Sequence, residues 1–196
     1  MKKYLFLPLM LLMVSIYAQP EHGGIKTSNG LLLYSNDGVN SYTLNLKDNF
    51  NIDNYPVIIQ NDNLFQFVVN DKKDFGSESK SILTNFMNWE FDHFKNQISG
   101  VTLNKNKFSS KNDKVFNHWK VTLPKFEGVK KSIKATYFLD FVHQDYIYRI
   151  SYSSLTGNDK EAEKLLAEMY NQIHFYNGDL DLQKLRNNIV EGTYYY

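Results

Sequence analysis

The sequence predicts a single α+β domain in which an antiparallel β-sheet is flanked by helices. Short segments carry the alternating or continuous apolar residues of strands, and two longer stretches repeat apolar residues at helical spacing. These segments come in the order hairpins, helix, further strands, helix. Aromatic residues make up 15% of the chain, which is typical of a packed globular domain rather than a disordered one.

The chain before the first helix is predicted to form two hairpins. In the first, over residues 30–46, the turn Ser35-Asn36-Asp37-Gly38 contains an Asp-Gly pair that is typical of a tight hairpin connection. In the second, over residues 56–70, the turn lies at 61–63 and the apolar residues are nearly continuous, which indicates inner strands.

The first helix is predicted over about 77–99. Gly76-Ser77 supplies a start and Gly100 a stop. Successive apolar residues are three or four positions apart, so one helix face must pack on other apolar groups. These residues are Leu83, Met87, Phe91, Phe94 and Ile98.

Strands are expected after this helix, at 101–108, 115–123, 133–142 and 146–153. The last two flank the short turn His143-Gln144-Asp145 and are followed by a helix over about 158–175. Asn158 is expected to cap this helix, with Glu161 reaching back to it. A one-sided apolar stripe predicts that the helix covers the sheet, and it consists of Ala162, Leu165, Leu166, Met169 and Ile173. A shorter helix is expected at about 179–190.

The N-terminal segment is typical of a secretory signal peptide. Lys2 and Lys3 precede an apolar stretch from Tyr4 to Ala18. The stretch is shorter than the roughly 20 apolar residues that cross a bilayer, so cleavage is favoured over a membrane anchor, with Ala18-Gln19 as the junction. The chain has no cysteine, which excludes a lipid-anchored bacterial lipoprotein and a disulfide framework.

Four parts of the chain follow from these observations. The signal peptide spans 1–18, a flexible tail 19–29, the α+β domain 30–176, and a C-terminal helix with a tyrosine-rich tail 177–196. No further stretch is apolar enough to span a membrane. The protein is therefore expected to be exported, either periplasmic or extracellular.

One region carries a resemblance to a known family. A tyrosine-rich strand of the pattern Y-x-I-x-Y, Tyr148-Arg149-Ile150-Ser151-Tyr152, leads through a short loop into a helix that ends I-x-F at Ile173-His174-Phe175. This resembles the PsbP/DcrB-like group of α/β/α sandwiches. The resemblance implies a compact antiparallel sheet between helices and a noncatalytic accessory or binding role. The matching positions are packing positions, so it implies no site residue.

The titratable side chains do not form a recognisable catalytic or metal site. Glu90 and His93 share a helix face, but carboxylate-bridged metal sites need two such pairs, so this face is expected to be solvated. Asp140 and His143 are three apart near a strand end and should point to opposite faces. The five histidines lack zinc-like spacing, and there is no nucleophile elbow, phosphate loop or dinucleotide fingerprint. No catalytic residue, metal or cofactor is predicted.

Lysine is distributed unevenly. Residues 105–134 hold nine lysines against Asp113 and Glu127, a net charge of +7, while the whole chain carries +1. Such a patch could bind an anionic envelope polymer or a lipid headgroup, whereas export disfavours nucleic acid. The candidate patch consists of Lys105, Lys107, Lys120, Lys125, Lys130 and Lys131. The alternative is that lysines simply protect edge strands from pairing.

The leading hypothesis is a noncatalytic envelope protein that binds a protein partner or an anionic ligand through this region. Two alternatives stay open. One is a hydrolase whose dispersed site is invisible as a motif, since catalytic triads are defined by geometry. The other is a structural subunit of an envelope complex, which would expose an apolar patch.

Overall fold

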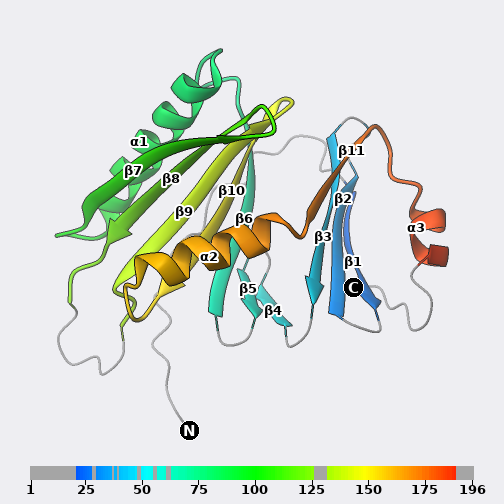
Figure 1. The fold of residues 1–196 in the computed structure, drawn as a ribbon, viewed down its shortest axis with the longest axis horizontal. Helices are drawn as coiled ribbons and strands as arrows, with labels where there is room; N and C mark the ends of the chain where they lie inside the picture. Colours follow the sequence, from blue (N-terminus) through cyan, green and yellow to red (C-terminus); the bar gives the residue numbers. More distant parts are fainter. Residues whose placement is uncertain are drawn as a thin grey trace, which may run out of the picture.

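The computed structural model describes residues 21–27, 30–36, 38, 40–47, 50–54, 57–60, 63–125 and 132–188. They form two sheets and three helices (Figure 1). The strands of the four-stranded sheet are, in spatial order, β1 (Glu21–Thr27), β2 (Gly30–Asn36), β3 (Asn40–Lys47) and β11 (Ile173–Asn177). The strands of the seven-stranded sheet are, in spatial order, β4 (Phe50–Asn54), β5 (Val57–Gln60), β6 (Asn63–Asp71), β10 (Tyr146–Ser154), β9 (Ala135–His143), β8 (Lys114–Thr122) and β7 (Thr102–Lys111).

Neighbouring strands in both sheets are antiparallel, which confirms the predicted fold class. Both predicted hairpins form, as β2–β3 and β5–β6. The predicted strands and turn around residues 143–145 form the β9–β10 hairpin. A second sheet was not expected from the sequence.

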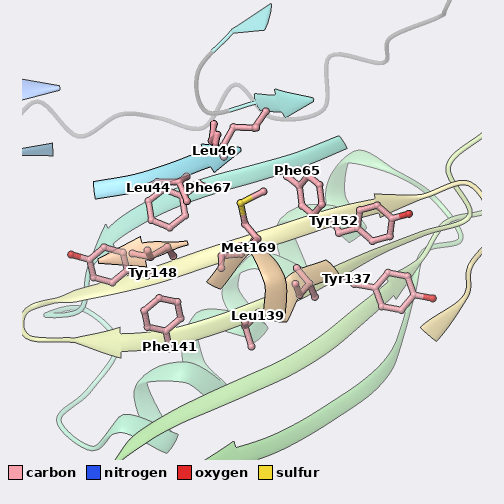
Figure 2. Packing of buried hydrophobic residues seen from close by; sticks show 14 of the residues in the cluster. Leu44, Leu46, Phe65, Phe67, Tyr137, Leu139, Phe141, Tyr148, Tyr152 and Met169 are labelled. Atoms are coloured by element: carbon pink, nitrogen blue, oxygen red, sulfur yellow. The ribbon is translucent and has the colours of Figure 1, made fainter. Parts of the chain in front are cut away.

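Two of the three helices lie on opposite faces of the seven-stranded sheet. On β9, the side chains of Tyr137, Leu139 and Phe141 face α2 (Asp159–Tyr170), while Phe138 between them packs on Phe94 of α1 (Ser79–Gln97). This alternation is the period of two that a strand imposes. The four-stranded sheet lies beside α2, and its residues Tyr42 and Leu44 join the same apolar cluster (Figures 1 and 2).

The α2 side of the sheet is filled by aromatic and aliphatic side chains. Figure 2 shows Met169 of α2 among residues of both sheets, including Leu44 of the four-stranded sheet and Phe65, Phe141 and Tyr152 of the seven-stranded sheet. The rings of Phe141 and Tyr148 stack, with centroids 5.4 Å apart. On its other face the four-stranded sheet is covered by residues of and near α3 (Leu182–Asn188), which pack on Ile25 and Tyr34.

Residues 21–27 are a strand and not part of a flexible tail, so this expectation was wrong. β1 pairs with β2 along its whole length. Gly23 fits there because the Tyr34 ring of β2 lies over it, and a Cβ at this position would come within 2.4 Å of the tyrosine oxygen. Gly23, in the segment predicted as a tail, is required by this cross-strand aromatic contact.

The last predicted long helix ends earlier than expected. α2 stops at Tyr170, and Ile173 to Asn177 form β11, which pairs with β3. Ile173 lies four residues after Met169 and so fits the helical stripe, but the apolar and aromatic run Ile173-His174-Phe175-Tyr176 also suits a strand. Asn158 caps α2 as predicted, accepting bonds from the backbone N–H groups of Lys160 and Glu161.

Two features of the helix ends also differ from the sequence expectation. The N-cap of α1 is Glu78, which makes no side-chain capping bond. Glu161 does not reach back to Asn158; its carboxylate accepts a hydrogen bond from the Thr156 hydroxyl. None of the helices in the described ranges is long and apolar enough to cross a membrane.

Candidate functional site

Lys120, the centre of the predicted basic patch, is bound within the fold. Its ammonium group lies 2.9 Å from the Asp159 carboxylate at the start of α2 and over the Tyr137 ring. The Tyr137 hydroxyl donates to the same carboxylate at 2.8 Å. Burial, together with this bond and the Asp159 charge, raises the pKa of Tyr137 well above its usual value. Lys120 therefore neutralises the Asp159 carboxylate and is not available as an open anion site.

Two other patch lysines are exposed. Lys107 lies on β7, and Lys125 follows the end of β8. Neither has an ion-pair partner among the described residues. The backbone of Lys105 pairs with Lys120 across the β7–β8 ladder. Lys130 and Lys131 lie outside the described residues, as do Ala18 and Gln19 of the expected cleavage junction.

Strand β7 is one edge of the seven-stranded sheet. Lys107, Ser109 and Lys111 alternate with Phe108, which packs under α1, so these three residues lie on the α2 side of the strand. Lys111 is exposed and, within the described ranges, has no ion-pair partner. We call the exposed lysines Lys107, Lys111 and Lys125 the basic edge.

A serine and a histidine meet beside the basic edge. Ser109 Oγ of β7 lies 2.9 Å from His118 Nε2 of β8. His118 also lines a cavity of about 10 Å³ between the sheet and α2, together with Tyr137, Glu163 and Leu166. A cavity of this size holds about one water molecule. Ser109 and His118 are thus in contact and Glu163 lines the same cavity, but the cavity cannot enclose a substrate.

The most highly charged site in the interior lies on the α1 side of the sheet. Arg149 of β10 is 2% exposed, and its Nε and Nη2 donate to the two carboxylate oxygens of Asp140 at 2.8 and 3.0 Å. Trp119 Nε1 donates to Asp140 Oδ2 at 2.7 Å. Arg149 Nη1 lies 2.6 Å from Glu90 Oε1 of α1. We call Glu90, Asp140 and Arg149 the buried charge cluster.

Aromatic rings enclose this cluster. The guanidinium carbon lies 4.2 Å from the ring centroid of Phe86 and 5.0 and 5.1 Å from those of Trp119 and Phe138. Burial alone would lower the pKa of Arg149, but the charges of Asp140 and Glu90 and the hydrogen bonds to Asp140 raise it. Arg149 therefore remains charged. The Arg149–Glu90 contact is an ion pair without hydrogen-bond geometry, and neither carboxylate oxygen of Glu90 has a hydrogen-bond partner in the part of the chain that the structure describes.

The expectation that Glu90 lies on a solvated helix face was wrong, because Glu90 is fully buried. It falls inside the apolar stripe, four residues from both Phe86 and Phe94. His93, three residues on, does not share its surroundings: it stacks beside Trp89 and lies 2.8 Å from the Gln97 amide nitrogen.

Asp140 and His143 point to opposite faces, as the strand period predicts. Asp140 joins the buried charge cluster on the α1 side, while the His143 ring contacts Phe175 of β11 on the other side. Lys114 lies over the same Phe175 ring. Burial, followed by the charge of Lys114, lowers the pKa of His143.

Within the described ranges, no group of three or more His, Asp and Glu side chains is arranged to hold a metal ion. Among the described residues, three features are candidates for a functional role. They are the basic edge, the Ser109–His118 contact and the outer surface of helix α1. The buried charge cluster has no opening to solvent, since each of its side chains is at most 3% exposed.

Comparison with known proteins finds similarity among solved structures but not among family models or curated sequences. No protein-family model matches the chain, and no curated protein sequence matches it. Among solved structures, the chain is similar to the solution structure of cyanobacterial PsbP (CyanoP) from Synechocystis sp. PCC 6803. The match covers 85% of this chain and 99% of that chain, with a TM-score of 0.42 and 11% sequence identity.

Proposed function

We propose that the protein is an exported, noncatalytic binding protein that takes an anionic polymer along the basic edge. The observation that carries this proposal is that Lys107 and Lys111 on the edge strand β7 are exposed and have no acidic partner among the described residues. Lys107 and Lys111 are four residues apart in a strand, a separation of about 13 Å. A polymer with repeated negative charges can contact both lysines at once.

The position of β1 supports export. Cleavage between Ala18 and Gln19 would leave Gln19 and Pro20 before β1, so the four-stranded sheet would lose no residue. We expect the protein recovered from the periplasm or the medium to begin at Gln19 when its N-terminus is sequenced. Recovery of the uncleaved chain from the cytoplasm alone would contradict export.

The basic edge is tested by charge reversal. We expect the double variant Lys107→Glu/Lys111→Glu to elute from a heparin column at clearly lower salt than the native chain, because counterion release scales with the number of lysine contacts. The matched control is Lys80→Glu/Lys164→Glu, which changes the net charge equally at two exposed lysines on α1 and α2. Equal elution of the two double variants would show that only net charge matters and would contradict a defined site.

A hydrolase is the second candidate, favoured by the Ser109–His118 contact. A serine hydroxyl bonded to a histidine is the arrangement that activates a nucleophile, and Glu163 lines the same cavity. If Ser109 is a nucleophile, a fluorophosphonate probe should label the native chain and fail to label Ser109→Ala. Labelling that is absent, or equal in both, would remove this candidate and leave the binding role.

The structural-subunit alternative has less support. Three large apolar side chains of the described residues are strongly exposed, and they lie on separate elements: Trp89 on α1, Leu155 before α2 and Tyr176 on β11. Scattered exposed residues of this kind are common on monomers and do not form a contiguous interface.

A further inference from the structure

Trp89 is an exposed aromatic residue that neither the core nor the basic edge uses. It is 47% exposed on α1, whereas Trp119, the other tryptophan of the chain, is 2% exposed. Leaving an indole in water forgoes the burial of a large apolar surface. An exposed tryptophan that is also held in one orientation is therefore a candidate for ligand contact.

The Trp89 ring is held by three neighbouring rings. It stacks with Phe86 and His93 at centroid distances of 6.1 and 6.2 Å, and Phe75 meets it edge-on at 5.9 Å. Phe86 is itself fully buried and lies against the guanidinium of Arg149. The ring is thus ordered before any ligand arrives, which lowers the entropy cost of binding.

Polar side chains flank the ring along the same helix face. Asn85, Trp89, His93 and Gln97 are spaced four residues apart, so they form one row on α1. We call these four residues the tryptophan row. Gln97 Nε2 lies 2.8 Å from His93 Nε2, and Asn85 Nδ2 donates to the Phe75 carbonyl oxygen at 2.8 Å.

These bonds orient the hydrogen-bonding groups of the row. An amide nitrogen can only donate, so His93 Nε2 accepts and its ring proton sits on Nδ1. The Nδ1 proton is then a donor, and the amide oxygens of Asn85 and Gln97 are acceptors. Groups of both kinds therefore lie beside the aromatic surface.

The tryptophan row carries no charged side chain. Two charged residues of α1 close to the row in sequence, Asp92 and Lys95, lie 3.6 Å from each other and form an ion pair. A ligand of this row therefore needs no charge, in contrast to a ligand of the basic edge.

We infer that the tryptophan row binds a neutral glycan. A pyranose ring presents an apolar C–H face that can stack on an indole, and hydroxyl groups at its rim that both donate and accept hydrogen bonds. A protein partner would instead surround a tryptophan with apolar contacts that exclude water, whereas this row has polar amides at both ends. The inference does not depend on the proposed role of the basic edge, since the two surfaces lie on different elements.

The inference is tested by titrating the chain from Gln19 onward with cellohexaose and, separately, with chitohexaose, which adds N-acetyl groups. We expect saturable binding to at least one hexaose by calorimetry, and protection of tryptophan fluorescence from acrylamide quenching, since Trp119 is already shielded. Trp89→Ala should weaken binding about tenfold or more. Gln97→Ala should have a smaller effect.

Two variants make the test decisive. Trp89→Phe keeps a ring against Phe75 and Phe86 and should retain part of the affinity, so a folding defect in Trp89→Ala would not decide the outcome. Tyr176→Ala removes an exposed aromatic residue elsewhere and should bind as the native chain does. The inference would be overturned if neither hexaose binds, or if Trp89→Ala, Trp89→Phe and Tyr176→Ala all bind with the affinity of the native chain. Unchanged hexaose binding by Lys107→Glu/Lys111→Glu would separate it from the basic edge.

Discussion

The two faces of the seven-stranded sheet are stabilised in different ways. The face toward α2 is covered by an aromatic and aliphatic cluster, and the charged pair beside it, Lys120 and Asp159, is partly exposed. The face toward α1 encloses three charged side chains, Glu90, Asp140 and Arg149, among aromatic rings. Apolar packing tolerates changes of shape, whereas a buried ion pair depends on keeping every partner. The two faces should therefore respond differently to substitution.

Removing Asp140 should have the largest effect. In Asp140→Ala, Arg149 loses both charge-assisted hydrogen bonds and Trp119 Nε1 loses its acceptor, so we expect a loss of about 3–5 kcal/mol in the free energy of unfolding. Urea denaturation measures it. A loss below about 1 kcal/mol would mean that water enters the site and replaces the carboxylate.

The companion experiment removes all three charges at once. Glu90→Leu/Asp140→Leu/Arg149→Met leaves no unpaired charge, and we expect it to be much more stable than Asp140→Ala. If the triple variant is as unstable as the single one, packing rather than charge determines the behaviour of this face.

On the apolar face, Leu139→Ala should cost about 3 kcal/mol, because it leaves a cavity in a well-packed cluster. Leu139→Met conserves most of the volume and should cost less than about 1.5 kcal/mol. Similar losses for both would indicate that this face is as intolerant as the charged one.

His143 should make stability depend on pH. Burial and Lys114 lower its pKa in the folded state, so below about pH 6.5 the unfolded chain binds a proton that the folded chain does not. Stability should therefore be constant with respect to this group above pH 6.5 and fall as the pH decreases toward the folded-state pKa. His143→Gln should flatten this part of the stability–pH profile. An unchanged slope would mean that other groups cause the dependence on pH.

Lys120 should have the smallest effect. Its ion pair with Asp159 is partly solvated, since Asp159 is 49% exposed, so Lys120→Ala should cost less than about 1 kcal/mol. The loss should shrink in high salt. A salt-independent loss would point instead to the contact of the lysine stem with Tyr137.

Local patterns predicted the elements whose partners are close in sequence. The β9–β10 hairpin and α2 follow from alternation, a short turn and the Asn158 cap. β1 was missed because its glycines indicate a loop until Tyr34 is known to lie over Gly23. β11 was missed because Ile173 fits the helical stripe as well as a strand.

The buried charge cluster could not be predicted from the spacing of residues in the sequence. Arg149 is flanked by the apolar residues Tyr148 and Ile150 in a strand, and Glu90 lies within the apolar stripe of a helix. Both positions indicate a buried charge. Their meeting depends on the register that pairs Arg149 with Asp140 and on the docking of α1 above them. For the same reason the Ser109–His118 contact, formed across the β7–β8 ladder, could not be found as a motif.

The pairing of β11 with β3 has a consequence for the order of folding. Leu44 pairs with Ile173, which lies far along the chain in the last strand. Closing so large a loop costs conformational entropy before any contact offsets it, and such long-range pairing slows folding. The edge of β3 therefore stays open until the C-terminal strand arrives, and a chain truncated after α2 should keep its early hairpins while exposing a strand that can pair with a second molecule.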